Sequence, residues 1–480
     1  MKKYLNVACK LMLFALILVS CKEDPLSNLT GLTSFKFMAD QKIPGLENLA
    51  FTIDQTNLLI ENKDSLPYKT DVSKLTAVFE AVLNATVMVN NVPQVSGTTT
   101  NDFSSPVTYK VTAQDGITVK YYTVKVNVAK TNPEAVRWNR EISSITDMKY
   151  ETLAAVWFNG KIRAIFGSTA GNVVATKYFT SADGKAWTEK TVSEASFPMG
   201  SMHRLVVHNN KLYVCGYLTV GSPWGFPMRA GAPEIWESAD GESFTKLGTT
   251  YTFDSGKLIS SLYSVNNKLW VVGGNTLGFG NPNGTKSTGS DFYGPAGLSN
   301  RIHNSSDMTT WDEPATALLP DGAPRRYSAN IVHGGKMFMI GGQIAGGFLK
   351  NDVWSSSDGL TWTKVSEGGF TARMQAAAVS YDNKIWLIGG QTSLGTCSKE
   401  ILVSTDGGVT WTLAANDVAL PGDFAPRAGH SAFLDGANKL WIIGGYAAEL
   451  KVETVDGVEQ RSEIITPKGD AWSGKLNKFN

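Results

Sequence analysis

Residues 439–445 read KLWIIGG, and close copies of this heptad recur upstream in the chain. The full copies are KIWLIGG at 384–390, KMFMIGG at 336–342 and KLWVVGG at 268–274, and the looser copies are KLYVCG at 211–216 and KIRAIFG at 161–167. Each copy is a short apolar strand that ends at glycine. A unit that recurs at intervals of tens of residues indicates a repeat architecture. The heptad therefore decides how the second part of the chain folds.

The neighbours of the heptad repeat with it. An apolar strand precedes it across a tight turn such as Asp382-Asn383 or Asn266-Asn267, and a variable loop follows it. A third strand then leads through a polar turn into a fourth strand. These turns read SADGKAW (181–187), SADGESF (238–244), SDGLTWT (357–363) and STDGGVTW (404–411), with degraded versions SDMTTW (306–311) and TPKGDAW (466–472). Four short antiparallel strands per repeat, six times over, predict a β-propeller.

Two features of the repeat resemble known propeller families. The double glycine, preceded in the last three copies by Arg326, Arg373 and Arg427, resembles kelch repeats. The stretch at 404–411 resembles the Asp-box hairpin of sialidases and other bacterial propellers. The resemblance implies an all-β, six-bladed, kelch-like propeller over residues 135–480 with Asp-box-like hairpins. Glycine there allows a positive φ, and tryptophan packs between adjacent blades.

The conspicuous aspartates of the polar turns are expected to be structural. In both families the aspartate carboxylate accepts backbone N–H bonds inside its own hairpin. We therefore expect no catalytic role for Asp183, Asp240, Asp358 and Asp406.

The closure of the ring leaves two possibilities. Residues 136–142, which include Trp138, look like a fourth strand without a blade, although Trp472 already supplies a fourth strand to the last repeat. We expect residues 136–142 to be an extra or closing strand of a six-bladed ring, and a seventh, partial blade is the alternative.

The first 21 residues predict a targeting segment. Lys2 and Lys3 precede an apolar run at 11–19 that is too short to span a bilayer. The run ends at LVSC (18–21), which resembles a bacterial lipobox and implies lipidation of Cys21; an ordinary secretory signal is the alternative. The charged residues 22–24 resemble the export tag of Bacteroidetes surface lipoproteins. This predicts an outer-membrane lipoprotein that faces the cell exterior and is held by acyl chains.

Residues 22–30 are expected to form a tether, and residues 31–130 an Ig-like β-sandwich. Apolar and polar residues alternate at Phe35 and Phe37, Val87 and Val89, Tyr109 and Val111, and Tyr122 and Val124. A period of two is the pattern of half-buried strands. The segment 96–116 resembles small sandwich modules that follow the anchor in Bacteroidetes surface lipoproteins, which implies a spacer; a glycan-binding sandwich is the alternative.

Composition excludes several classes of function. The net charge is +1 and no dense Lys/Arg block occurs, which argues against a nucleic-acid partner. His203, His303 and His430 lack metal-ligand spacing, and we find neither a Ser-His-Asp constellation nor a phosphate loop. We therefore predict no catalytic residue, no metal and no cofactor. Cys215 and Cys397 are expected to be buried thiols.

A ligand site is expected on the propeller face that carries the variable loops. Residues 217–233 contain Trp224, Phe226 and Arg229, and residues 275–302 contain Phe279 and Tyr293. Aromatic rings beside polar side chains suit a saccharide, although these loops can also simply cap the channel.

Arg326, Arg373 and Arg427 should lie near the axis on the same face. They would either clamp the carboxylate of an acidic sugar or bond carbonyl groups between blades, as kelch arginines commonly do.

Three functions remain open at this point. The first is a non-catalytic surface binding or scaffold protein that captures a glycan. The second is an enzyme acting on sialic or uronic acids, because kelch propellers include a sialic-acid mutarotase and Asp-box propellers include sialidases. The third is a platform for another protein in an outer-membrane complex.

Overall fold

The computed structural model describes residues 25–147, 150, 152–168, 175–193, 196–197, 200–220, 228–229, 234–248, 261–274, 298–312 and 318–479. The predicted targeting segment and Cys21 lie outside these ranges. The chain divides into two compact units, Met1–Pro133 and Glu134–Asn480. In the described part both units are built from strands, and the helices are short 3-10 turns: η1 (Leu46–Asn48), η4 (Ala345–Gly347) and η5 (Asn477–Phe479). No helix in this part has the length and apolarity needed to cross a membrane.

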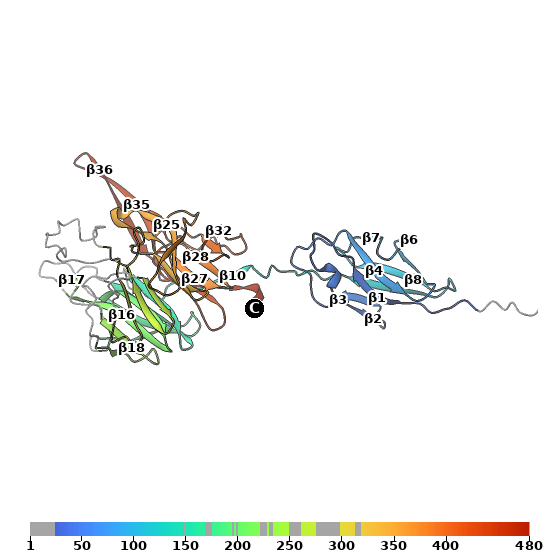
Figure 1. Cartoon of the computed structure of the whole chain (residues 1–480), viewed down its shortest axis with the longest axis horizontal. Coiled ribbons are helices and arrows are strands. Elements are labelled where there is room, and N and C mark those ends of the chain that lie inside the picture. The colour runs from blue at the N-terminus through green and yellow to red at the C-terminus, as the bar shows by residue number, and fades with distance from the viewer. Residues whose placement is uncertain are drawn as a thin grey trace, which may run out of the picture. The chain divides into compact units, whose positions relative to one another are not determined.

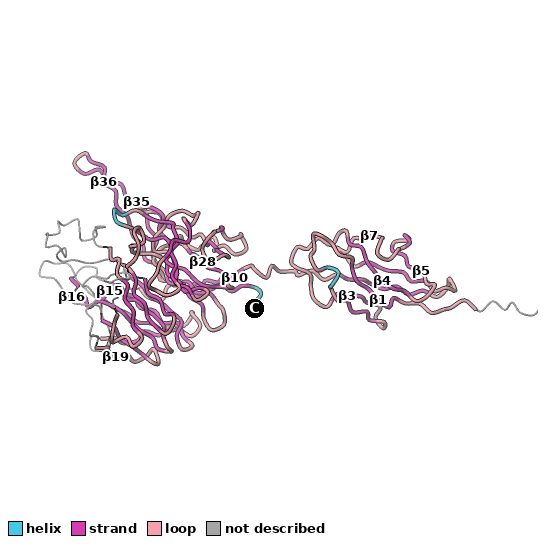
Figure 2. Tube along the Cα trace, viewed as in Figure 1, coloured by secondary structure: helices cyan, strands magenta, loops and turns pink. Residues whose placement is uncertain are grey.

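The N-terminal unit consists of two sheets (Figures 1 and 2). The smaller sheet has the order β1 (Leu32–Phe37), β4 (Leu75–Ala81), β7 (Thr100–Asn101). The larger sheet has the order β2 (Phe51–Asp54), β3 (Leu59–Asn62), β9 (Val119–Lys125), β8 (Val107–Thr112), β5 (Thr86–Val89), β6 (Val92–Pro93). Neighbouring strands are antiparallel except for β3 and β9, which are parallel.

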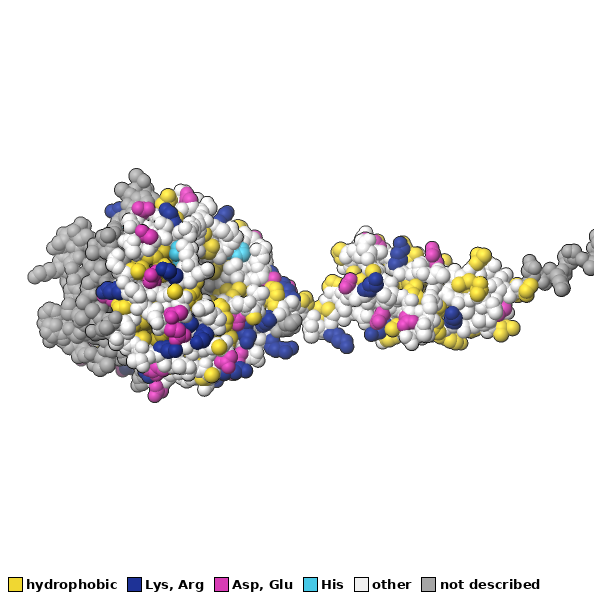
Figure 3. All heavy atoms as spheres, turned by 90° about the horizontal axis from the view of Figure 1, so that it is seen from below, with side chains coloured by type: hydrophobic (Ala, Val, Ile, Leu, Met, Phe, Trp, Pro, Cys, Tyr) yellow, Lys and Arg dark blue, Asp and Glu magenta, His cyan; other side chains and the backbone are white. Residues whose placement is uncertain are grey.

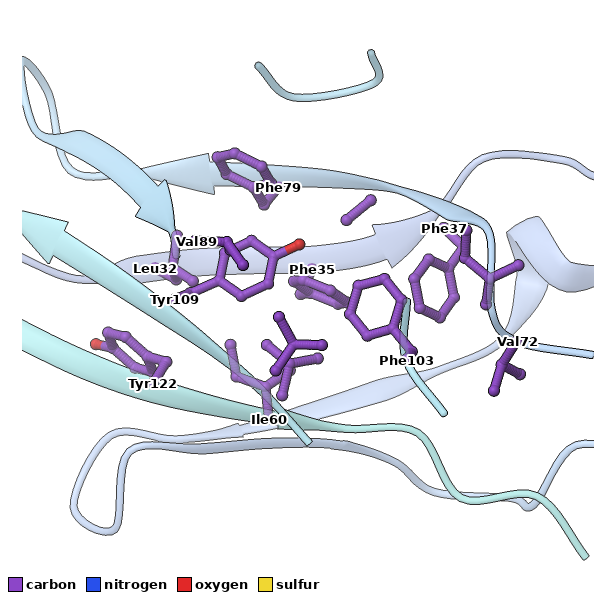
Figure 4. Packing of buried hydrophobic residues seen from close by; sticks show 14 of the residues in the cluster. Leu32, Phe35, Phe37, Ile60, Val72, Phe79, Val89, Phe103, Tyr109 and Tyr122 are labelled. Atoms are coloured by element: carbon purple, nitrogen blue, oxygen red, sulfur yellow. The ribbon is translucent and has the colours of Figure 1, made fainter. Parts of the chain in front are cut away.

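One apolar core lies between these two sheets (Figure 4). Phe35 and Phe37 of β1 are buried in it together with Tyr109 and Val111 of β8, as their alternation predicted. The ring of Tyr109 meets that of Phe35 edge to face, with 5.8 Å between centroids. Inward side chains from both sheets thus share one core, which is how paired sheets are stabilised.

The second unit contains six sheets of three or more strands among its described residues. In chain order, the first sheet consists of β11 (Thr152–Phe158), β12 (Lys161–Ser168), β13 (Ala175–Ser181) and β14 (Thr188–Lys190). The second consists of β15 (Gly200–His208), β16 (Lys211–Val220), β18 (Glu234–Ser238) and β19 (Thr245–Lys246), with β17 (Met228–Arg229) paired to β16, and the third of β20 (Ser261–Val265), β21 (Lys268–Val272) and β22 (Ile302–Ser305). The fourth consists of β23 (Ala329–His333), β24 (Lys336–Gln343), β25 (Leu349–Ser356) and β26 (Thr363–Ser366). The last two are β27 (Ala377–Tyr381), β28 (Lys384–Ile388), β31 (Ile401–Ser404), β32 (Thr412–Leu413); and β33 (Ser431–Leu434), β34 (Leu440–Ile443), β37 (Ala471–Leu476), β10 (Val136–Ile142). Two hairpins stand apart, β29 (Gln391–Ser393) with β30 (Thr396–Cys397), and β35 (Tyr446–Val455) with β36 (Val458–Pro467).

The first strands of consecutive sheets contact one another around a ring. β11 contacts β15, and the series continues through β20, β23, β27 and β33. β33 in turn contacts β11, so the ring is closed. Sheets arranged radially about one axis make a β-propeller, as the repeats predicted.

Every heptad forms the second strand of its sheet, and in the four full copies a double glycine follows the apolar run of that strand. Gly341 and Gly342 have φ values of 58° and 98°. A Cβ on Gly341 would lie 2.7 Å from the carbonyl oxygen of Arg373, so the next sheet's backbone occupies the space of a side chain. Glycine is needed here for both reasons.

The ring closes through the start of the unit. β10 pairs antiparallel with β37, with Trp138 opposite Gly474. The indole N–H of Trp138 donates to the carbonyl of Val418 at 2.9 Å. Residues 136–142 therefore close the ring, as expected, but the assignment of Trp472 to a fourth strand was wrong. Trp472 lies in β37, the third strand, between β34 and β10.

Large side chains of one sheet cover the hairpin glycines of the next. A Cβ on Gly184 would lie 2.1 Å from the ring of Trp441, and one on Gly359 would lie 2.5 Å from Trp270. The hairpin residue Trp362 is buried in one cluster with Trp270, which belongs to the preceding sheet. Tryptophan packing between sheets is thus confirmed at this interface.

Candidate functional site

The polar turns have the hydrogen bonds that the sequence predicted. The carboxylate of Asp240 accepts the backbone N–H groups of Glu242 at 2.7 Å and Ser243 at 2.9 Å. These bonds lower the pKa of Asp240 to about 2. Equivalent pairs of N–H bonds reach the side chains of Asp183, Asp307, Asp358 and Asp406. The turn at Asp307, described above as degraded, therefore retains the full geometry.

The last turn, TPKGDAW, is different. Asp470 accepts two hydrogen bonds from the guanidinium of Arg427, at 2.5 and 3.1 Å, and one from the indole of Trp472 at 2.8 Å. This is the arrangement that Asp352 makes with Arg325 and Trp354 within the third strand β25. The interpretation of residues 466–472 as a degraded polar turn was wrong, because this Asp-x-Trp belongs to a different structural position.

The predicted arginines bind the protein's own backbone. Arg427 donates to the carbonyls of Ala425 and Gly444, at 3.1 and 3.0 Å. Arg373 donates to the carbonyls of Thr371 and Gly389, both at 3.0 Å. Both side chains are about 1% exposed, as the structural interpretation of these residues expects.

The third member of this arginine set is Arg325, which corrects the assignment of Arg326. Arg325 donates to the carbonyls of Ala323 and Gly341, at 2.9 and 2.8 Å. Arg326, one residue later, instead donates to the side-chain oxygen of Gln343 at 2.8 Å and lies over the ring of Tyr327. Two adjacent arginines in the sequence hid this one-residue offset.

The predicted loop residues are only partly within the described structure. Trp224, Phe226, Phe279 and Tyr293 lie outside the described residues. The backbone of Arg229 pairs with Thr219, between β17 and β16.

A cluster that the sequence analysis missed lies where the chain enters the first strands. Short bridges join Arg326 to Gln343, Met374 to Gln391, and Ala428 to Tyr446. In each pair the first residue lies just before a first strand of a sheet, and the second residue directly follows the double glycine of a heptad. Two of the latter are glutamine in the repeated sequence GGQ, a signal that could have identified them.

A series of backbone hydrogen bonds connects these bridges across three sheets. The N–H of Gln375 donates to the carbonyl of Tyr327, and the N–H of Gly429 donates to the carbonyl of Gln375, both at 2.8 Å. All three residues have positive φ, between 54° and 65°. We call Tyr327, Gln375, Gln391 and Tyr446 the rim cluster. Its local geometry is fixed by backbone bonds.

The rim cluster is rich in hydrogen-bonding groups. The hydroxyl of Tyr446 lies within hydrogen-bond distance of the side-chain oxygens of Gln375 and Gln391. The amide nitrogen of Gln391 donates to Glu463 at 2.8 Å. Burial raises the pKa of Tyr446 well above its usual range, so its hydroxyl is neutral at physiological pH.

Arg204 of β15 adds a positive charge beside this cluster. Its guanidinium interacts electrostatically with Tyr327 and Cys215, and burial lowers its pKa. An arginine keeps its charge even so. Neutral amides and phenols beside one guanidinium are groups that can bind a polar ligand with several hydroxyl groups.

The described residues hold no group of three or more metal-binding side chains. Cys215 and Cys397 are free cysteines, and both residues are partly buried, so the expectation of buried thiols is met in part. Burial raises the pKa of both thiols, that of Cys215 to about 12. Lys, Arg, Asp and Glu are interspersed on the face shown in Figure 3.

Comparisons with known proteins found a similar solved structure and two matching family models. A solved structure described as "Structure of YjhT" is 15% identical, with 66% of this chain and 98% of that chain covered and a TM-score of 0.47. No curated protein matches the sequence. The DUF6242 N-terminal domain matches residues 25–126, and the DUF6242 beta propeller domain matches residues 132–480. Because these matches cover most of its length, the chain belongs to the DUF6242 family.

Proposed function

We propose that this protein is a non-catalytic binding or scaffold protein of the cell surface that captures a glycan on the loop-bearing face of its propeller. In this proposal Cys21 carries the lipid that holds the chain to the outer membrane, facing the exterior. An Ig-like N-terminal module spaces the second unit from the membrane. The second unit is a six-bladed propeller with kelch-like arginines and Asp-box-like hairpins.

The rim cluster is the observation that carries the glycan proposal. Tyr446, Gln375 and Gln391 form one hydrogen-bonded group drawn from two sheets. Amide and phenol groups both donate and accept, which matches the hydroxyl groups of a sugar. Backbone bonds hold the positions of Tyr327 and Gln375, so the site is organised before ligand arrives.

The long loops supply the apolar half of the proposed site. The loops with Trp224 and Phe279 leave second strands β16 and β21, as Gln343 and Gln391 leave β24 and β28. They therefore leave from the same ends of their sheets. In the proposal, Trp224, Phe226, Phe279 and Tyr293 provide rings against which the C–H faces of a sugar pack.

Affinity electrophoresis of the purified chain in polysaccharide gels tests this function. Tyr446→Phe should weaken retention roughly tenfold, because it removes a hydroxyl that the proposal assigns to the glycan site. Tyr121→Phe, which removes a hydroxyl from an exposed tyrosine of the N-terminal unit, is the matched control and should change nothing. Lack of retention by neutral and acidic polysaccharides alike would contradict the proposal.

Arg204 favours a second candidate, an enzyme acting on sialic or uronic acids. A guanidinium near Tyr327 suits a carboxylate ligand. Catalysed anomer exchange of such a sugar, followed by NMR and abolished by Arg204→Gln, would support this candidate. Unchanged exchange rates with the wild-type chain would exclude it.

A further inference from the structure

The hairpin of β35 and β36 extends away from the other sheets of its unit (Figure 1). Nearly all its residues beyond Ala448 are exposed. They include the apolar side chains of Leu450, Val452, Val455, Val458, Ile464 and Ile465. In the described part of the chain, β36 pairs with β35 and with no other strand. An isolated two-stranded hairpin is marginally stable in water, and a free edge readily accepts another strand.

The turn determines which backbone groups of β36 point outward. Asp456 and Gly457, both with positive φ, form a two-residue turn closed by Val455 opposite Val458. In such a turn the closing pair exchanges both hydrogen bonds. Residues 458, 460, 462 and 464 therefore bond to β35, and residues 459, 461, 463 and 465 present their N–H and C=O groups outward. Pro467 has no N–H and belongs to the outward set, where a proline is tolerated.

We propose that β36 pairs antiparallel with β36 of a second copy of this chain about a two-fold axis at Ser462. The outward residues then face one another, because 461 lies opposite 463 and 459 lies opposite 465. Two hairpins thereby form one four-stranded sheet, an isologous interface.

Charge complementarity selects this partner and this register. Arg461 faces Glu463 of the second copy on both sides of the axis, and Glu459 faces Ile465. Opposite charges in directly facing positions stabilise a strand pair, and like charges destabilise it. Within one chain Arg461 forms an ion pair with Glu459, and both side chains are more than half exposed. Such an exposed ion pair contributes little stability, so Arg461 can leave Glu459 and pair with Glu463 of the second copy at small cost.

The neighbouring registers fit less well. Pairing about Gln460 would keep a contact between Arg461 and Glu459 but would align only residues 458–462. Pairing about Ile464 would place Glu463 opposite Ile465 and leave Arg461 opposite Pro467. The axis at Ser462 aligns residues 458–466 and places Arg461 opposite Glu463 on both sides of the axis.

Sedimentation velocity of the purified chain, from about 1 to 100 μM, tests the proposal. We expect a reversible dimer for the wild-type chain. Arg461→Glu or Glu463→Arg alone places like charges opposite each other, and each should raise the dimer Kd at least about tenfold. An equimolar mixture of the two variants restores both opposite-charge contacts and should return the wild-type Kd.

Lys451→Glu is the matched control, because Lys451 lies on β35 opposite Ser462, away from the proposed edge. This charge reversal on the same hairpin should leave the Kd within about twofold. Circular dichroism verifies that each variant is folded. A wild-type chain that stays monomeric throughout the range, an unchanged Kd in Arg461→Glu, or folded variants that fail to associate when mixed would each overturn the proposal.

Discussion

Substitution of Asp352 by asparagine should destabilise the propeller unit far more than the equivalent change at Glu400. Arg325 and Asp352 form two hydrogen bonds, at 2.6 and 3.0 Å, and their side chains are 0% and 1% exposed. Arg373 makes the corresponding bond to Glu400 at 2.8 Å, but the glutamate side chain is 47% exposed. The two sites therefore differ mainly in how much water reaches the carboxylate.

The magnitudes follow from that difference. Removing one partner of a buried ion pair costs about 3–5 kcal/mol, because the remaining charge is left uncompensated. Asparagine retains an oxygen that Arg325 can still bind, so we expect about 3 kcal/mol for Asp352→Asn. Glu400→Gln should cost at most about 1 kcal/mol, since water already solvates that carboxylate.

Guanidinium unfolding followed by tryptophan fluorescence measures both variants. All 13 tryptophans lie in the second unit, starting at Trp138, so the signal reports on the propeller alone. The midpoint should fall in Asp352→Asn with an unchanged slope. Hydrogen bonds and charge from Arg325 lower the pKa of Asp352 in spite of its burial. The stability difference between the wild-type chain and Asp352→Asn is therefore fully present above the ordinary aspartate pKa of 3.8, and it is lost as the pH falls further below that value. Equal losses for the two variants at neutral pH would refute the reasoning from burial.

Three further predictions concern packing, protonation and closure. Gly184→Ala should lower the free energy of unfolding by roughly 2 kcal/mol more than Gly407→Ala, because both glycines have positive φ but only the former would place a Cβ against Trp441; chemical denaturation compares them. Burial, together with the nearby Arg427 charge, lowers the pKa of His430 to about 3. The stability of the wild-type chain should therefore fall as the pH drops below about 6.5, and this residue should account for a loss of about 2 kcal/mol at pH 5. His430→Gln should remove this contribution and flatten the pH profile of stability. Trp138→Ala should cost about 3–4 kcal/mol and accelerate proteolysis near the closing strand, measured by limited digestion.

Each of these has a clear contrary result. Equal losses in the two glycine variants would show that the Trp441 ring moves aside at no cost. A parallel pH dependence in wild type and His430→Gln would show that this imidazole does not set the acid sensitivity. Unchanged digestion of Trp138→Ala would mean that the remaining β10 contacts hold the strand in place.

The repeated elements of the fold could be predicted because each carries a local signal. Gly341 and Gly342 follow the apolar run of a second strand, and that run can be read from the sequence alone. Asp240 accepts N–H groups only two and three residues away, so its role also follows from local chemistry. Such features need no knowledge of distant contacts.

The error at Trp472 arose because tryptophan occurs at two different positions of the repeat. Trp362 follows a polar turn, whereas Trp354 lies in a third strand two residues after Asp352. Trp472, like Trp354, lies in a third strand two residues after an aspartate. The long hairpin of β35 and β36 precedes β37, so the distance of Trp472 from its heptad no longer shows which of the two positions it occupies.

The rim cluster could not be predicted from local pattern. Tyr446 reaches Gln375 across 71 residues and Gln391 across 55, and only the ring arrangement brings them together. Each glutamine by itself resembles an ordinary polar loop residue. A site of this kind depends on which ends of which strands meet, which is a property of the topology.

The pairing of β10 with β37 has a consequence for biosynthesis. Ser473 and Glu141, which are hydrogen bonded across this join, are 332 residues apart in sequence. β10 is synthesised hundreds of residues before β37 and stays without this partner until β37 has been made. Prematurely terminated chains would expose two unsatisfied strand edges, and those are the features that chaperones and proteases engage. The join thus makes synthesis through β37 a condition for a protease-resistant propeller.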